Sequence, residues 1–254
     1  MTRVIKVGGR AQRDPLLAST LAAVWNVTPG ELCVVHGGGD EISSLQRALG
    51  CQPTFVAGRR VTTERDIDTV RMVLSGVANK RLVAQLIAAG APALGLSGED
   101  AALIVARPLD PQTLGRVGQP ERVNIALLWH LLDGGYLPVV APLARDETSA
   151  EGGALNVNGD DAAAAIAAAL RAAELFLIAD VPGVLVDGEP ASVLDVDDAL
   201  AAIRDGIASG GMTAKLQAGI AALRHGVRKV RIGDLNAVLD PTCGTTLATS
   251  RSLV

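Results

Sequence analysis

The chain has 254 residues, of which 49% are hydrophobic and 2% aromatic, and its formal net charge at pH 7 is -4. This length allows one large α/β domain or two lobes, with a core built from alanine, valine, leucine and isoleucine. The acidic balance and the shortage of aromatic side chains argue against nucleic-acid binding, which needs a basic surface or stacking platforms.

Cysteine usage and hydropathy exclude further classes. Cys33, Cys51 and Cys243 are widely spaced, with no CxxC pair or Cys/His cluster, so neither a disulfide framework nor a zinc site is indicated. The long alanine tract from Ala162 is broken by charged residues before it reaches membrane-spanning length, and no leader precedes the first apolar run. The sequence therefore predicts a cytoplasmic protein without membrane contact.

Residues 3–7 predict the first strand, because β-branched residues dominate and the pair Gly8-Gly9 ends it. Lys6 is a cation inside this apolar run, and buried lysines are rare unless something pairs with them. An ammonium group beside open glycine amides indicates an anion site, with phosphate as the expected ligand. The alternative is a plain β-turn with a lysine head that reaches solvent.

A helix over residues 15–27 and a strand over 32–35 follow, by apolar spacing. His36-Gly37-Gly38-Gly39-Asp40 comes next, and Asp40 is expected to cap the following helix. Free amides and the helix dipole at this second glycine turn again favour an anion. His36 is expected to be a turn residue or hydrogen-bond donor, since no carboxylate or nucleophile is paired with it.

The middle of the chain begins with a predicted β-hairpin over residues 53–62, with Gly58 in its turn and Arg59 and Arg60 on its return. A long helix bent at Gly76 follows and reaches residue 87. The next expected elements are a strand over 91–96, a β-ribbon formed by 103–107 and 115–123, a helix over 125–132 and a strand over 137–141.

The last third starts with a polar turn, Asn156-Val157-Asn158-Gly159-Asp160, before an alanine-rich helix over 162–169. Further strands are expected over 175–179, 229–232 and 244–247, and helices over 196–203 and 209–223. Alternation of strands and helices predicts a three-layer αβα sandwich with a largely parallel central sheet. The polar segment 144–153 is the expected boundary between an N-lobe, 1–150, and a C-lobe, 151–254, within a single domain.

Several nucleotide-binding and hydrolase motifs are absent: GxxxxGK[ST], a well-placed GxGxxG, and GxSxG. What remains is Lys6 and Lys215 beside glycine turns, with Asp160 after the polar turn. Phosphoryl transfer needs positioning and charge neutralisation, which two lysines and glycine amides could supply. An aspartate between the lysines would hold both and keep them protonated. The alternatives without a chemical role are that Asp160 is a helix N-cap and that Lys215 is a solvated helix residue.

Nine short stretches occur in the order found in one family and cover nearly the whole chain. They are Val4-Ile5-Lys6-Val7-Gly8-Gly9, His36-Gly37-Gly38-Gly39, Gly58-Arg59-Arg60-Val61-Thr62, Asn79-Lys80, Gly95-Leu96-Ser97-Gly98, Asn156-Val157-Asn158-Gly159-Asp160, Asp180-Val181-Pro182-Gly183-Val184, Gly211-Met212-Thr213-Ala214-Lys215 and Gly244-Thr245. The chain resembles the amino acid kinase superfamily and, within it, the acetylglutamate kinases. The resemblance implies that fold, ATP-dependent phosphorylation of the γ-carboxylate of N-acetyl-L-glutamate, and a homodimer that uses the N-lobe.

The resemblance also implies roles for individual residues. Lys6 would stabilise the transferring phosphoryl group, Lys215 would bind nucleotide phosphates and Asp160 would organise both lysines. Other residues have binding roles: Gly8, Gly9, Gly38 and Gly39 would offer amides, Arg60 and Asn156 would hold the α-carboxylate, and Asp180, Val181, Gly183, Val184, Leu185, Ile207 and Ser209 would line the ATP site. Mg²⁺ would be held by nucleotide phosphates, without a protein ligand set.

The residue inventory fits a carboxylate acceptor, because a γ-carboxylate is already ionised and needs no general base. Three alternatives stay open. A kinase for carrier-linked aminoadipate or glutamate could use Arg59, Arg60, Arg65 and Arg71 as a basic patch for an acidic carrier, with Arg59 competing with Arg60 as the carboxylate ligand. An N-succinylated substrate is the second alternative. A nucleotide-binding regulatory subunit without catalysis is the third.

Overall fold

The computed structural model describes residues 1–186 and 188–249, and in this part of the chain the central element is an eight-stranded sheet in the order β14-β16-β15-β11-β1-β2-β8-β5. Its strands are β1 (Arg3–Val7), β2 (Leu32–His36), β5 (Ala93–Ser97), β8 (Leu137–Ala141), β11 (Glu174–Ile178), β14 (Val193–Asp195), β15 (Lys229–Gly233) and β16 (Thr245–Ala248). Neighbours pair in parallel except β15 with β16. The prediction of a largely parallel central sheet is confirmed.

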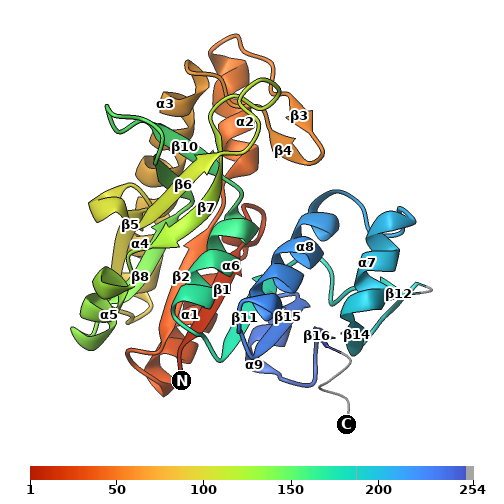
Figure 1. Cartoon of the computed structure of the whole chain (residues 1–254). Coiled ribbons are helices and arrows are strands. Elements are labelled where there is room, and N and C mark those ends of the chain that lie inside the picture. Colours follow the sequence, from red (N-terminus) through yellow and green to blue (C-terminus); the bar gives the residue numbers. More distant parts are fainter. Residues whose placement is uncertain (187, 250–254) are drawn as a thin grey trace.

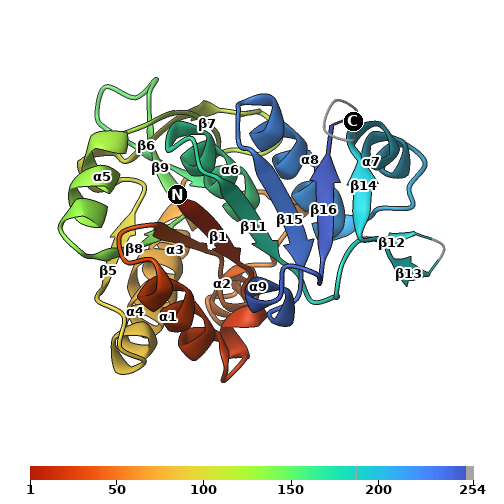
Figure 2. The ribbon, with the colours of Figure 1, turned by 90° about the horizontal axis from the view of Figure 1, so that it is seen from below.

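Helices cover both faces of this sheet (Figures 1 and 2). One face carries α6 (Gly159–Ala169) and α8 (Gly210–Arg224), and the other carries α1 (Leu17–Val27), α4 (Asn79–Ala88) and α9 (Asn236–Leu239). The remaining helices are η1 (Ala11–Arg13), α2 (Gly39–Ala48), α3 (Asp66–Arg71), η2 (Met72–Ala78), η3 (Asp100–Ala102), α5 (Ile125–Asp133) and α7 (Val196–Arg204). This is the three-layer αβα sandwich that the alternating elements predict.

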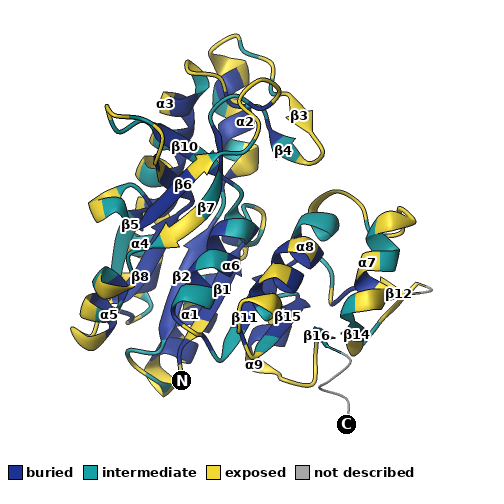
Figure 3. Cartoon of the chain, in the orientation of Figure 1, coloured by how far each residue is buried: buried dark blue, intermediate teal, exposed yellow. Residues whose placement is uncertain are grey.

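Strand β1 divides its side chains between the two faces, because successive side chains of a strand point to opposite sides. Val4 joins the core cluster that contains residues of α6 and α8. Ile5 and Val7 join the cluster that contains residues of α1 and α4. Lys6 therefore shares the face of Val4 and points toward α6 and α8. Figure 3 shows these central strands as almost entirely buried.

A small closed barrel stands above one end of the sheet (Figure 1). Its strands are β6 (Ile104–Pro108), β7 (Val117–Val123), β9 (Leu143–Asp146) and β10 (Ala154–Val157). The predicted β-ribbon is its antiparallel pair β6–β7. The segment 144–153 was expected to be loop-like, but its first residues belong to β9. β10, beyond the expected lobe boundary, pairs with both β9 and β7, and the division into two lobes stays a prediction.

Local differences from the predicted elements have clear physical reasons. Gly38, not Asp40, is the N-cap of α2. Asp40 lies in the first turn, where its negative charge interacts favourably with the positive end of the helix dipole. The bend expected at Gly76 is a π-helical segment, η2, between α3 and α4. Two short strand pairs stand apart from the main sheet: β3 (Phe55–Val56) with β4 (Arg59–Arg60), the predicted hairpin, and β12 (Leu185–Val186) with β13 (Glu189–Pro190).

Among the helices of residues 1–186 and 188–249, none has the length and apolar character that crossing a lipid bilayer requires.

Candidate active site

The site begins where the polar turn enters α6. The side chain of Asn158 caps this helix by accepting a hydrogen bond of 2.8 Å from the backbone N–H of Asp160. Asp160 itself lies in the first turn and is buried. The helix-cap alternative for Asp160 is therefore wrong. Asn158 caps the helix, so the Asp160 carboxylate can bind other partners.

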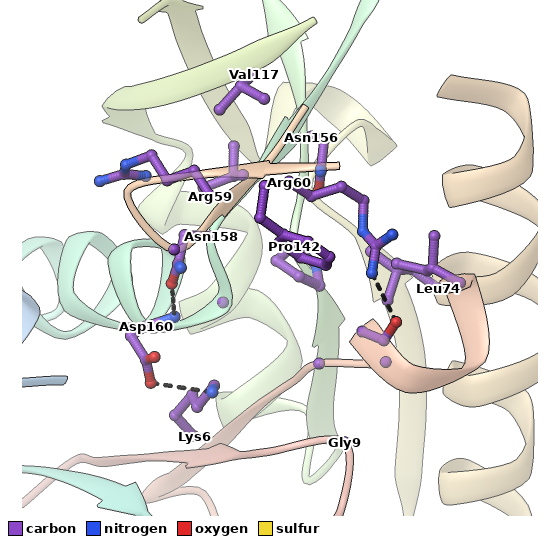
Figure 4. Close-up of a pocket in the computed structure, with 18 residues that line it drawn as sticks. Lys6, Gly9, Arg59, Arg60, Leu74, Val117, Pro142, Asn156, Asn158 and Asp160 are labelled. Carbon is purple, nitrogen blue, oxygen red and sulfur yellow. Dashed lines mark hydrogen bonds and ion pairs between the residues drawn. The ribbon is translucent and has the colours of Figure 1, made fainter. Parts of the chain in front are cut away.

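Two lysines share one oxygen of this carboxylate. Lys6 Nζ and Lys215 Nζ each lie 3.0 Å from Asp160 Oδ1, and the three side chains are buried. Lys6 comes from β1, Asp160 from α6 and Lys215 from the second turn of α8, so strand alternation and two helix starts bring them together. Figure 4 shows Lys6 and Asp160 facing each other below the pocket.

Charge and burial act against each other in this cluster. Burial raises the pKa of the Asp160 carboxyl, but the two ammonium groups outweigh it and leave that pKa below its usual value. Burial and the neighbouring Lys6 lower the pKa of Lys215 to about 8, against the pull of Asp160. The cluster carries a net positive charge and suits a polyanion.

A cavity of about 220 Å³, here called the hairpin pocket, opens beside Lys6 and Asp160. Its wall includes five more of the predicted site residues: Gly9, Gly38, Gly39, Arg60 and Asn156. Gly9 and Gly39 also line the neighbouring cavity. The pocket is also lined by Arg59, Asn158 and the apolar side chains of Leu74, Val117 and Pro142, which are labelled in Figure 4. The pocket therefore has cationic groups at two ends and apolar walls between them.

Arg60 is fixed in the wall of this pocket. Its guanidinium donates to Gln46 Oε1, to Ser43 Oγ at 2.8 Å and to the backbone oxygen of Gly39 at 2.7 Å, and it lies over the ring of Phe55. Burial lowers its pKa, yet an arginine stays protonated at neutral pH. These three acceptors leave part of its fork of five N–H groups for a ligand.

Asn156 closes the same wall from β10. Its Nδ2 donates to Thr62 Oγ1 at 2.9 Å, which fixes the direction of the amide. Ser43, Gln46 and Thr62 were not predicted as part of the site. Thr62 ends the quoted stretch 58–62, but that stretch gave it no role. No sequence signal could have identified Ser43 and Gln46, because each acts through its contact with Arg60.

Two further cavities continue from the lysines. The first, the lysine cavity of about 490 Å³, is lined by Lys6, Gly8, Gly9, Asp160, Asp180, Val181 and Lys215. The second, the apolar cavity of about 470 Å³, is lined by Val181, Gly183, Val184, Leu185, Ile207 and Ser209. The lysine cavity shares lining residues with the hairpin pocket and, at Val181 and Met212, with the apolar cavity, so it lies between the other two.

Thr245 shapes the edge of the apolar cavity. Its Oγ1 accepts a hydrogen bond of 2.7 Å from the backbone N–H of Val184 and donates one of 2.6 Å to the oxygen of Ala191. A Cβ at Gly183 would lie 2.6 Å from this oxygen, so only glycine fits there. The stretch Gly244-Thr245 was quoted for the family resemblance, but this role depends on the fold.

His36 is the last residue of β2, not part of the turn, and it is buried. It makes hydrogen bonds, as the other predicted role requires. Its Nδ1–H donates to the oxygen of Gly37 at 3.0 Å, and its Nε2 accepts from Asn79 Nδ2 at 3.1 Å. Burial lowers the pKa of His36 to about 4. The neutral imidazole therefore links α4 to the glycine turn of the hairpin pocket, and both of its nitrogens are occupied by hydrogen bonds within the chain.

The described residues contain no group of three or more His, Cys, Asp or Glu side chains placed to hold a metal ion. Asp160 is engaged by two lysines, and Asp180 lies 3.3 Å from Arg10 Nη1. A divalent cation in the lysine cavity would accordingly take most of its ligands from phosphate oxygens.

Comparisons with known proteins point to one family. A model of the amino acid kinase family matches residues 1–234. Acetylglutamate kinase of Roseiflexus sp. (strain RS-1) is 44% identical over 252 residues, which are 98% of this chain and 94% of the relative. Acetylglutamate kinase of Methanopyrus kandleri is 42% identical over 248 residues, with 93% and 96% covered.

Solved structures show the same fold. The structure of smu.665 from Streptococcus mutans UA159 superposes with a TM-score of 0.85 at 30% identity, covering 92% of this chain and 94% of that one. Carbamate kinase from Giardia lamblia bound to AMP-PNP gives 0.75 at 17% identity, with 98% of each chain covered, a likeness of fold alone. The chain belongs to the amino acid kinase family, and the curated relatives compared here are acetylglutamate kinases.

Proposed function

We propose that this protein is a kinase that transfers the γ-phosphoryl group of ATP to the γ-carboxylate of N-acetyl-L-glutamate, the second step of arginine biosynthesis. The observation that carries the proposal is the shared Asp160 oxygen, which holds two lysines between the hairpin pocket and the nucleotide-sized cavities. The acetylglutamate kinases among its relatives support this choice of substrate.

The acceptor would lie in the hairpin pocket. Arg60 and Asn156 would hold its α-carboxylate, for which a guanidinium is a good bidentate partner. The γ-carboxylate would then face Lys6 and the amides of Gly9, Gly38 and Gly39. Such a carboxylate is ionised at neutral pH, so its oxygen attacks phosphorus without a general base. The new O–P bond forms as the bond to the β-phosphate oxygen breaks, and ADP leaves.

ATP would occupy the other two cavities. The adenine group would fill the apolar cavity, and the phosphates would reach Lys215, Lys6 and the amides of Gly8 and Gly9 in the lysine cavity. Mg²⁺ on the phosphates would add charge neutralisation to that of the lysines. Lys6 is the lysine that borders both the hairpin pocket and the lysine cavity, so we assign it to the moving phosphoryl group.

The carrier-linked alternative loses support at the hairpin. Arg59 pairs with Asp161, Arg71 pairs with Glu99 and Asp68, and Arg60 is buried in the pocket wall. Arg59, Arg60 and Arg71 are therefore engaged within the chain, which leaves Arg65, exposed at the start of α3, as the remaining member of the basic patch that an acidic carrier would need. A nucleotide-binding regulatory subunit without catalysis would need lysines in the lysine cavity, but it would not need Lys6 to border the hairpin pocket as well.

The test is trapping of the acyl phosphate with hydroxylamine, using N-acetylglutamate, N-succinylglutamate, and free and carrier-bound aminoadipate as acceptors. We expect hydroxamate from N-acetylglutamate with the highest kcat/KM. Turnover on the carrier-bound substrate alone would refute the proposed acceptor, and turnover on none would refute the proposed activity.

We further propose a cytoplasmic homodimer. Cys33, Cys51 and Cys243 are all free thiols, which fits a reducing compartment. Met72 and Val77 on η2 and Ile87 on α4 are each more than half exposed, and they lie in the N-lobe that the family resemblance suggests for dimerisation. Exposed apolar side chains on adjoining helices are typical of interfaces between subunits.

A further inference from the structure

The β3–β4 hairpin roofs the hairpin pocket while belonging to no larger sheet. Its two strands pair only with each other in the described part of the chain, and it stands clear of the sandwich in Figure 1. Its Phe55, Gly58 and Arg59 line the pocket. A Cβ on Gly58 would lie 4.0 Å from the backbone oxygen of Gly210, so the tip also reaches the start of α8.

Consecutive arginines fasten this hairpin to opposite walls. Because side chains alternate along a strand, Arg59 and Arg60 of β4 point to opposite sides, as Figure 4 shows. Arg60 donates to Gly39 and Ser43 of α2. Arg59 Nη1 lies 2.7 Å from Asp161 Oδ2 in the first turn of α6. β4 is therefore a strap across the pocket, tied at both sides.

The two ties differ in burial. Arg60 is buried and bound to three groups of α2. The side chains of Arg59 and Asp161 are 23% and 14% exposed, so this pair is partly shielded yet open to water. Burial outweighs the attraction of Arg59 and leaves the pKa of the Asp161 carboxyl above its usual value. The ion pair between Arg59 and Asp161 can accordingly break without exposing a buried group, whereas breaking the contacts of Arg60 would expose a buried guanidinium.

We propose that Arg59 and Asp161 are positioning residues whose ion pair is a releasable latch, closing the hairpin over the bound acceptor. The proposal rests on the proposed function, because it takes the hairpin pocket to be the acceptor site. Opening the latch lets the acyl amino acid enter and leave. Closing it ties the roof to the same turn of α6 that carries Asp160, so the acceptor is held beside the lysines.

The experiment compares Arg59→Gln, Asp161→Asn and the double variant with wild type. Arg122→Gln, which removes an exposed pair with Glu147 on the barrel, is the matched control. Each single variant should raise KM for N-acetylglutamate about tenfold, with KM for ATP and the melting temperature close to wild type. Since the two residues act as a unit, the double variant should be no worse than either single one. Arg59→Lys should restore part of the loss.

A second readout needs no turnover. Hydrogen exchange of the hairpin amides should be faster in Arg59→Gln and Asp161→Asn than in wild type or Arg122→Gln. Additive KM effects, equal rises in both KM values, or unchanged hairpin exchange would overturn the latch. If wild type turned over none of the acceptors while the hairpin exchange still responded as expected, the proposed function would fail and the latch would stand as a structural tie.

Discussion

One carboxylate oxygen organises the chemistry at the scale of single residues. Asp160 Oδ1 accepts from two ammonium groups, so a buried anion is balanced by two buried cations and the surplus charge is left for a ligand. Lys6 could be predicted from the sequence, because a lysine in an apolar strand before two glycines needs a partner. Its partner could be selected only through the family motifs, since Asp160 and Asp161 look alike in the sequence.

The protonation of Lys215 gives a pH prediction. Its pKa is lowered to about 8, and only the ammonium form neutralises phosphate, so kcat/KM for ATP should fall as pH rises through about 8. Replacement by arginine should remove this alkaline decline, because a guanidinium stays charged, even if the overall rate drops. Persistence of the same decline in Lys215→Arg would show that another group titrates.

Gly159 makes room for Lys6. A Cβ there would lie 3.1 Å from Lys6 Cε, so Gly159→Ala should displace the ammonium group and lower kcat about tenfold. Gly76→Ala, where a Cβ meets open space, is the control and should keep the wild-type kcat. Steady-state kinetics at saturating ATP and N-acetylglutamate measure both, and a wild-type kcat in Gly159→Ala would contradict the close approach.

At the scale of elements, strand alternation and glycine turns allowed most of the sheet to be predicted. The barrel could not be predicted, because β9 and β10 are only four residues long and their pairing with β6 and β7 is set by tertiary contacts. The π-helical form of η2 was equally hidden, since Gly76 signals only a weak point in a helix. Roles such as that of Thr245 depend on contacts across 61 residues.

The contact between β2 and α4 through His36 predicts an acid-sensitive stability. Burial lowers the pKa of His36 from 6.5 to about 4, so between these values the unfolded state binds more protons than the folded state. The free energy of unfolding is thus complete above pH 6.5 and should lose up to about 3 kcal/mol as pH falls toward 4.

Urea unfolding between pH 7.5 and pH 4.5 measures this loss. Because carboxylates also titrate in that range, the informative quantity is the difference between wild type and His36→Gln, which keeps a hydrogen-bonding side chain beside Asn79. The variant should be less stable at pH 7.5 and show a shallower decline toward acid. Parallel curves would mean that His36 is not buried as a neutral group.

At the scale of the whole molecule, the sites proposed for the two substrates are neighbouring cavities. The hairpin pocket lies under β3–β4, and the apolar cavity is lined by β12, α7 and the start of α8. The lysines line the cavity between them. The sequence predicted this layout only through the family motifs, because periodicity gives elements but not which cavities they enclose. The division into lobes at 144–153 stays a prediction.

Assembly can be tested on the exposed apolar side chains of η2. Met72→Glu/Val77→Glu should convert a dimer into a monomer, because two charges would be buried in the interface. Light scattering after gel filtration measures the mass, and Val27→Glu, at an exposed apolar site on α1, is the control. A monomeric wild type, or a dimer that survives both charges, would contradict the proposed interface.

The most direct measurement is the single-turnover rate of Lys6→Met with saturating ATP and N-acetylglutamate. Lys6 would act on the moving phosphoryl group rather than on nucleotide binding, so the rate should fall about 100-fold or more while the Kd for ATP changes little. Asp40→Asn, which alters another charge bordering the lysine cavity, should lose far less. A rate for Lys6→Met within about threefold of wild type would contradict the assignment of the phosphoryl-transfer site.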